Sequence, residues 1–191
     1  MDIYSPAEDS YLLSEALTDY LDKKDKKIKI LDMGSGSGIQ AETCKKLGFK
    51  NILCADINSN AVTHLKKQGF DSIKTDLFEK LYKRRGDLLG ETLVPIRFDL
   101  IIFNPPYLPE DKYDKEKDTT AGRKGYELIL KFLEEAKEYL DKNGEILLLF
   151  SSFSKPKIIL RYADKIGYNS KLLAKKRIFF EELFVYLFEP K

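Results

Sequence analysis

Apolar and polar residues alternate along the chain in blocks that predict strands and helices in turn. Short apolar runs, each about as long as one buried strand, lie at 28–33, 51–56, 72–77, 100–103 and 145–150. Between these runs, apolar residues recur every three or four positions within longer polar segments, which indicates amphipathic helices. Two further runs, at 170–177 and 182–188, are joined by a tight connection and predict an antiparallel hairpin.

This order of elements predicts an α/β fold with three layers. Strands that alternate with helices form a mostly parallel sheet covered on both faces, and the carboxyl-terminal hairpin adds antiparallel strands at one edge. The expected fold is therefore a Rossmann-like three-layer sandwich with seven strands. One of its helices is expected over 126–140, with Asn143 and Gly144 as its stop signal.

The length of 191 residues suits a single domain. We expect residues 1–27 to supply an amino-terminal helix and residues 78–97 to form an insertion between the third and fourth strands. This insertion is the least regular part of the chain, and its first half is basic. A basic segment can face an anionic partner, although a solvated charge run explains it more simply.

The fourth apolar run ends abruptly in Asn104-Pro105-Pro106-Tyr107. The two prolines forbid both ladder pairing and helix, so the strand stops with Asn104 at the carboxyl edge of the sheet, where open parallel sheets bind ligands. Asn104 can offer one acceptor and two donors to a planar polar group, and Tyr107 can stack on that group. The alternative is a strand-ending turn that uses Asn and Pro for their turn chemistry.

Gly34, Gly36 and Gly38 follow the first strand directly and precede a helix. Such a turn lets the backbone approach a ligand at a helix amino terminus. The spacing departs from the dinucleotide-binding fingerprint, because Ile39 stands where that fingerprint needs its third glycine. Asp32, just before the turn, would repel a pyrophosphate but could pair with an amino group. These features favour a cationic cofactor that bears an amino acid, such as S-adenosylmethionine.

Two more strands end in acids. Asp56 lies about 20 residues past the glycine turn, where an acid can accept hydrogen bonds from ribose hydroxyls. A helix amino-terminal acid favoured by the helix dipole is the alternative for Asp56. Asp76 ends the third strand and could meet the adenine amino group, or it could simply be an acid of a surface loop.

Composition and charge narrow the function further. Lys and Arg number 33 against 31 Asp and Glu, and a net charge of +2 gives no global argument for nucleic-acid binding. We find no apolar run of membrane-spanning length and no signal-like amino terminus, so a cytoplasmic protein without a membrane span is expected. Cys44 and Cys54 fit neither a disulfide framework nor a zinc-ligand spacing, and His64 has no clustered partners, so no metal site is expected.

Together these residues resemble class I S-adenosylmethionine-dependent methyltransferases that act on amino or amide nitrogens. More narrowly, the chain resembles the short HemK-type glutamine methyltransferases, which modify class 1 release factors in archaea and eukaryotes. The resemblance runs from Tyr4 to the final hairpin. It is carried by Asp32-x-Gly34-x-Gly36-x-Gly38, Asp56, Asp76, Asn104-Pro105-Pro106-Tyr107, Tyr4-x-Pro6-x-Glu8-Asp9 and Ala121-Gly122-x-x-Gly125.

The resemblance implies a role for each of these residues. The Asn104 side-chain oxygen and the Pro105 carbonyl would accept the two hydrogens of the target amide, and Tyr107 would hold its plane. S-adenosylmethionine contacts are implied for Asp32, Gly34, Gly36, Gly38, Asp56, Asp76, Leu77 and Asn104. Substrate contacts are implied for Tyr4, Pro6, Glu8, Pro106, Tyr107 and Gly122.

The family also implies partners: a peptide chain release factor as substrate and a small zinc-binding activator subunit. The same Asn-Pro-Pro-Tyr chemistry serves exocyclic amines of adenine or guanine, so an RNA or DNA N-methyltransferase is the alternative function, and a non-catalytic scaffold is a third possible function.

Two features depart from the family pattern: Ala121 replaces the first glycine of a pair, and the insertion is long. We expect both to lie near the substrate entrance and to bear on substrate identity.

Overall fold

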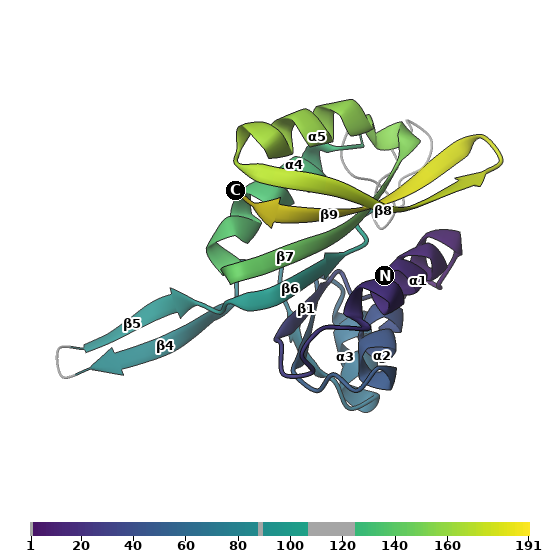
Figure 1. The fold of residues 1–191 in the computed structure, drawn as a ribbon. Coiled ribbons are helices and arrows are strands. Elements are labelled where there is room, and N and C mark those ends of the chain that lie inside the picture. The colour runs from purple at the N-terminus through teal and green to yellow at the C-terminus, as the bar shows by residue number, and fades with distance from the viewer. Residues whose placement is uncertain (1, 88–89, 107–124) are drawn as a thin grey trace.

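Seven strands form one sheet in the order β3-β2-β1-β6-β7-β9-β8 (Figure 1). The computed structural model describes residues 2–87, 90–106 and 125–191. The sheet strands are β1 (Ile30–Met33), β2 (Ile52–Asp56), β3 (Asp71–Lys74), β6 (Phe98–Phe103), β7 (Leu140–Ser151), β8 (Tyr168–Ile178) and β9 (Glu181–Pro190). The helices are α1 (Glu8–Leu21), α2 (Ile39–Lys46), α3 (Ser59–Lys67), α4 (Glu127–Ala136) and α5 (Pro156–Lys165), with short 3-10 turns η1 (Lys137–Tyr139) and η2 (Ser152–Ser154).

The pairing of the strands confirms the predicted mixed sheet. Strands β3, β2, β1, β6 and β7 run parallel to one another, whereas β9 is antiparallel to both β7 and β8. The centre of the sheet is covered on both faces, which explains why its strands read as unbroken apolar runs rather than alternating ones.

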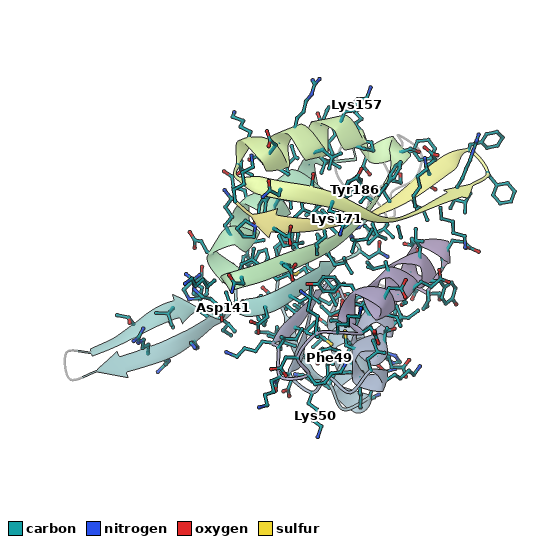
Figure 2. All side chains as sticks on the ribbon, viewed as in Figure 1. Phe49, Lys50, Asp141, Lys157, Lys171 and Tyr186 are labelled. Carbon is teal, nitrogen blue, oxygen red and sulfur yellow. The ribbon has the colours of Figure 1, made fainter. Side chains whose placement is uncertain are left out.

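Side chains of one strand divide between two apolar layers. In β6, Leu100 and Ile102 pack toward α1, α2 and α3, while Ile101 and Phe103 pack toward α4 and α5. Figure 1 shows these helices on opposite faces of the sheet, so the three-layer sandwich is confirmed. The same layering separates neighbouring residues. Phe49 is buried in the layer next to α1, α2 and α3, while Lys50 points outward (Figure 2).

The helix expected over 126–140 ends earlier than predicted. The structure ends α4 at Ala136, and β7 already begins at Leu140, which pairs with Phe98. The next β6–β7 pair is Leu100 with Glu145, so the register shifts between them. A Cβ on Gly144 would lie 2.6 Å from the Phe98 carbonyl oxygen. Asn143-Gly144 therefore marks an irregularity within a strand, which needs a glycine for close backbone approach.

Residues 82–95, here called the hairpin arm, fall within the expected insertion. Strands β4 (Tyr82–Asp87) and β5 (Gly90–Pro95) form a separate two-stranded antiparallel sheet that extends away from the body (Figure 1). A hydrogen bond from the Ile96 amide to the Leu81 carbonyl closes its base at 2.9 Å. The arm leads into the first residues of β6, whereas Asn104 follows its last residue. The arm therefore lies at the amino ends of the parallel strands, away from Asn104. The expectation that it borders the substrate entrance is wrong.

Both cysteines are buried free thiols. Cys44 on α2 and Cys54 on β2 lie in the same apolar layer, and burial raises the pKa of each thiol. No helix that the structure describes is both long enough and apolar enough to cross a membrane.

The Gly38→Ala substitution should destabilise the fold more than Gly69→Ala. Both glycines have left-handed backbones, with φ of 87° and 81°, so both substitutions lose about 1 kcal/mol of unfolding free energy. Only at Gly38 would the new Cβ also meet a core side chain, 2.6 Å from Leu65 Cδ2, while nothing lies within 4 Å at Gly69. Overpacking of this kind costs a further 1–3 kcal/mol, roughly. Urea unfolding measures both, and equal losses would show that the α2–α3 contact is not tight.

Candidate active site

The predicted site residues gather at the carboxyl ends of three neighbouring strands. Asp32 lies in β1, Asp56 ends β2, and Asn104 follows β6. The registers place Asp32 beside Cys54 on one side and beside Ile102 on the other, so the loops that follow these strands leave the sheet at one edge. In the sheet, β2 and β3 lie on one side of β1, and β6 and β7 lie on the other, so the strand order reverses between β1 and β6. A crevice for ligands opens at such a topological switch point.

Residues 34–38, here called the glycine loop, curl over the ends of β1 and β2. Its three glycines have left-handed backbones, with φ of 62°, 51° and 87°. The Ser35 amide donates to the Ala55 carbonyl at 3.2 Å, and the Gly38 amide donates to the Ser35 carbonyl at 2.7 Å. At Gly34 an added Cβ would lie 3.1 Å from the Phe103 ring. The loop is thus a close backbone surface that side chains would obstruct.

Asp32 is a buried acid at the base of this loop, with only 2% of its surface exposed. Its Oδ2 accepts a hydrogen bond from the Ala41 amide of α2 at 3.2 Å. Burial raises the pKa of the carboxyl from 3.8 to about 7 and the charge of Asp56 adds to the rise, although the bond from Ala41 opposes it. A buried carboxylate with one backbone donor is costly unless a cation pairs with it. The site therefore suits a positively charged ligand group.

Asp56 braces the glycine loop, a role the sequence did not indicate. Its Oδ2 accepts from the Gly36 amide at 2.8 Å, and its Oδ1 accepts from the Asn58 amide at 2.7 Å. The carboxylate thereby connects the end of β2 to the middle of the loop. Its expected contact with ribose hydroxyls stays a prediction.

Asp76 and Leu77 follow β3 at the neighbouring position. The Thr75 amide donates to the Asp56 carbonyl at 3.0 Å, which brings this segment to the same edge. Asp76 is exposed, whereas Leu77 is buried and has a left-handed backbone with φ of 43°. Such a conformation is strained for a leucine and is often found at ligand sites.

The carboxamide of Asn104 is held by an acid that the sequence analysis did not select. Asn104 Nδ2 donates to Asp9 Oδ2 at 2.9 Å. The other oxygen of Asp9 accepts from the Ser10 amide at 2.7 Å and from the Tyr4 hydroxyl at 3.1 Å. Asp9 is 4% exposed. Because an ionised carboxylate only accepts hydrogen bonds, it turns the NH₂ group of Asn104 toward itself and the oxygen away.

That oxygen, Asn104 Oδ1, is buried and receives no hydrogen bond from the described residues. A buried acceptor without a donor costs roughly 1–3 kcal/mol. Pro105, which is also buried, follows it directly and cannot donate from its backbone. A ligand that brings an N–H group would satisfy this oxygen.

The amino-terminal segment joins the two halves of the site. Tyr4 reaches Asp9 with its hydroxyl, and its Cβ lies 3.9 Å from the position of a Cβ on Gly36. Burial, and then the charge of Asp9, raise the pKa of the Tyr4 hydroxyl. Gln40 of α2 donates to the Ser10 carbonyl at 2.9 Å, which fixes the start of α1 beside the glycine loop.

Other predicted substrate residues are placed less directly. Glu8 is exposed and pairs with Lys176. Its neighbour Asp9, and not Glu8, contacts Asn104. The substrate role of Glu8 stays a prediction. Pro6 and Pro106 are half-buried. Tyr107 and Gly122 lie outside the described residues. The signal for Asp9 was its helical spacing, because it lies three and four residues before Leu12 and Leu13 on the buried face of α1.

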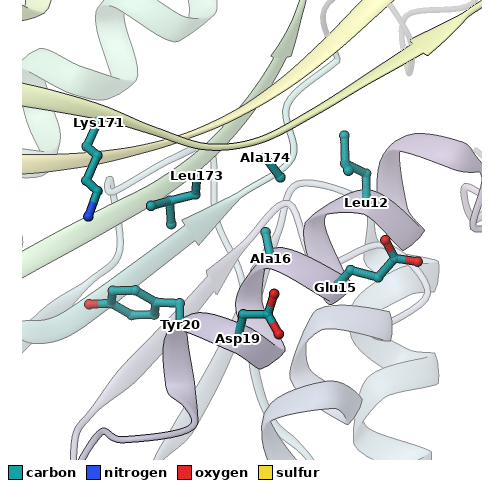
Figure 3. Close-up of a pocket in the computed structure, with 8 residues that line it drawn as sticks. All are labelled: Leu12, Glu15, Ala16, Asp19, Tyr20, Lys171, Leu173 and Ala174. Carbon is teal, nitrogen blue, oxygen red and sulfur yellow. The ribbon is translucent and has the colours of Figure 1, made fainter.

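A pocket between α1 and β8 contains none of these residues. It measures about 380 Å³ and is lined by Leu12, Glu15, Ala16, Asp19, Tyr20, Lys171, Leu173 and Ala174 (Figure 3). It lies along the middle and end of α1, whereas the start of α1 holds Asn104. Across the part of the chain that the structure describes, no three His, Cys, Asp or Glu side chains are grouped to hold a metal ion.

Comparisons with known proteins show what this chain is similar to. Residues 10–178 match the family described as the methyltransferase small domain. A Methanocaldococcus jannaschii protein that bears the name of a protein N5-glutamine methyltransferase is 33% identical over 190 residues, which cover 96% of this chain and 90% of that protein. The release factor glutamine methyltransferase of Clostridium acetobutylicum is 30% identical over 82% of this chain, which spans about half (53%) of that relative's length.

A solved structure shows the same fold. The Mtq2–Trm112 complex of E. cuniculi, described as responsible for methylation of the translation termination factor eRF1, matches over 100% of both chains. The TM-score is 0.77 and the sequence identity is 24%.

The Asp32→Asn substitution should stabilise the ligand-free chain, and more so at high pH. The Asp32 pKa is about 7 when folded and near 3.8 when unfolded, so only the unfolded chain ionises as the pH first rises. The free energy of unfolding of the wild type therefore falls between about pH 4 and pH 7, by at most several kcal/mol at roughly 1.4 kcal/mol per unit.

Urea unfolding of both proteins at about pH 5 and about pH 8 measures this difference. We expect the advantage of Asp32→Asn to grow with pH and to level off above pH 7. Equal pH dependence of the two proteins would mean that Asp32 is not an acid kept neutral by burial.

Proposed function

The chain belongs to the methyltransferase small domain family, and we propose that it transfers a methyl group from S-adenosylmethionine to the side-chain amide nitrogen of a glutamine in a peptide chain release factor. The family matches the one that the sequence motifs resemble. The release factor is named for the Clostridium acetobutylicum relative, and eRF1 methylation is described for the Mtq2–Trm112 complex. The observation that carries the proposal is the buried oxygen of Asn104, turned away from Asp9 and without a donor among the described residues.

The residues at the sheet edge fit S-adenosylmethionine, which supplies a methyl group bound to a positively charged sulfur. Asp32 would pair with the amino group of the cofactor, and its burial strengthens that pairing. The glycine loop would lie against the amino-acid part, and Asp56 would meet the ribose. Asp76 and Leu77 would border the adenine. The Asn104 side chain would lie between the bound cofactor and the substrate amide.

Methylation of an amide nitrogen is difficult because its lone pair is delocalised into the carbonyl. Asn104 Oδ1 and the Pro105 carbonyl would each accept one hydrogen of the target NH₂ group, which fixes the nitrogen and directs its lone pair. The nitrogen then bonds to the methyl carbon as the carbon–sulfur bond breaks, the electron pair of that bond stays on sulfur, and the nitrogen releases a proton to water. Orientation of two reactants supplies roughly 7–11 kcal/mol in favourable cases, so no strong base is required.

A small partner subunit is part of the proposal. The solved structure with the same fold is a complex of Mtq2 with Trm112, and the exposed edge strand β3 of this chain leaves backbone groups unpaired on one side. We expect a small zinc-binding protein to raise the activity or solubility of this chain. A monodisperse chain that is fully active alone would contradict that expectation.

The chain should label a release factor with methyl groups from S-adenosylmethionine, and it should not label the same factor after its target Gln→Ala substitution. Asn104→Ala should lower the turnover about 10²- to 10³-fold, the usual effect of losing one oriented polar contact to the reacting group. Incorporation of radioactive methyl groups measures both. The thermal unfolding temperature of the variant, followed by circular dichroism, serves as the control for an intact fold.

Equal labelling of the wild-type factor and of its Gln→Ala variant would contradict the proposed substrate. Labelling of RNA in place of the factor would favour the alternative, in which Asn104 receives an exocyclic amine of adenine or guanine.

A further inference from the structure

The turn between β8 and β9 consists of two phenylalanines that pack against nothing. Phe179 and Phe180 are each 96% exposed, while the next most exposed large apolar side chain among the described residues, Leu93, reaches 67%. Phe179 also has a left-handed backbone with φ of 40°, which bulky residues seldom adopt. Two-residue hairpin turns favour Gly, Asn and Asp. Folding therefore gives no reason for phenylalanine at either position of this turn, here called the aromatic turn.

The aromatic turn lies at the same sheet edge as Asn104. Strand β7 runs parallel to β6, and β9 returns antiparallel to β7, so the start of β9 lies beside the carboxyl end of β7. The Glu182 amide donates to Ser152 Oγ, just past that end, at 3.1 Å. Figure 1 shows this end of the β8–β9 hairpin extending beyond the sheet on the side of α1.

One ion pair and one electrostatic interaction connect this hairpin end to the residues that hold Asn104. Lys176 of β8 pairs with Glu8 at the start of α1, next to Asp9. The charge of Glu181 contributes to the raised pKa of the Tyr4 hydroxyl, which donates to Asp9. Glu181 Oε1 is itself buried, with no donor among the described residues. The aromatic turn is thus the outermost part of the rim around the proposed reaction centre.

Charges around the aromatic turn are balanced rather than basic. Lys175 pairs with Glu182 at 2.7 Å, and Lys176 pairs with Glu8. Of the charged residues next to the turn, this leaves the cation Arg177 and the acid Glu181, whose charges balance. A neutral rim with two bare aromatic rings offers little attraction to a phosphate backbone, whose binding depends on excess positive charge. It suits an apolar hollow on a folded protein, since aromatic side chains are the commonest anchors of protein interfaces.

We propose that Phe179 and Phe180 are an anchor that docks the folded protein substrate while its glutamine side chain reaches Asn104. This inference rests on the proposed function and adds to it a surface for substrate recognition. The target glutamine must enter a buried site, so the protein surface around it must rest on the rim. Two exposed rings at that rim would hold the protein without taking part in the reaction.

The test compares the double variant Phe179→Ala/Phe180→Ala with the wild type on two substrates: the folded release factor and a short peptide limited to the residues around its glutamine. For the folded factor, kcat/KM should fall about 10- to 100-fold through KM, with kcat unchanged. For the peptide, kinetics should stay within about twofold. Leu93→Ala is the matched control, because it removes an exposed apolar side chain at the opposite edge.

Stability provides the second control. Because neither ring is buried, the double variant should unfold at the wild-type temperature. Phe179→Gly should unfold at the same or a higher temperature and show a smaller rise in KM, because Phe180 remains. An unchanged KM for the folded factor would overturn the docking surface and leave the proposed function intact. The docking surface would also be overturned if the wild type were a dimer that dissociates in the double variant. The same holds if the double variant lost affinity for RNA and kept its affinity for the folded factor. No methylation of the factor by the wild type would overturn the proposed function and the docking surface together.

Discussion

The hydrogen bond between Asn104 and Asp9 decides which atom of a carboxamide faces the candidate site. Asparagine can present either its oxygen or its NH₂ group, and the two are nearly equal in shape. The carboxylate of Asp9 accepts only, so it holds Nδ2 at 2.9 Å and leaves Oδ1 turned away from Asp9. Strand β6 supplies one partner and helix α1 the other, 95 residues apart in the chain. The fold therefore has to bring the amino terminus to the central switch point of the sheet before the site exists.

Several features of the site oppose stability. Asp32 is buried with a raised pKa, Asn104 Oδ1 has no donor in the part of the chain that the structure describes, and Leu77 has a left-handed backbone. Each costs free energy that two apolar layers around the sheet must offset. The costs coincide at one edge of the sheet, and a ligand with a cationic group and an N–H donor would relieve the first two. This pattern is what is expected of a preorganised binding site, in which unfavourable contacts in the empty chain become favourable ones on binding.

The sequence predicted what local patterns determine and missed what only tertiary contacts determine. Continuous apolar runs located the central strands, and the residues that end them gave Asp32, Asp56 and Asn104, because the ends of parallel strands must share an edge. The helical spacing of α1 places Asp9 on the buried face, whereas its contact with Asn104, 95 residues away, depends on tertiary packing that no local pattern encodes. The helix expected to reach Leu140 ends at Ala136 because pairing of Leu140 with Phe98 overrides its helical spacing. The hairpin arm was expected at the substrate entrance, but its position follows from the direction of β6. Phe179 and Phe180 were read only as part of a tight connection.

The central claim is that Asp9 fixes the orientation of Asn104, and the turnover of the Asp9→Asn variant on the release factor tests it most directly. Asparagine at position 9 keeps the size of the side chain but can donate as well as accept, so Asn104 would no longer be held in one orientation. The account predicts a kcat lowered about tenfold or more, with unchanged affinity for S-adenosylmethionine and an unchanged kcat for Asp19→Asn on the exposed side of the same helix. A wild-type kcat in Asp9→Asn would contradict it.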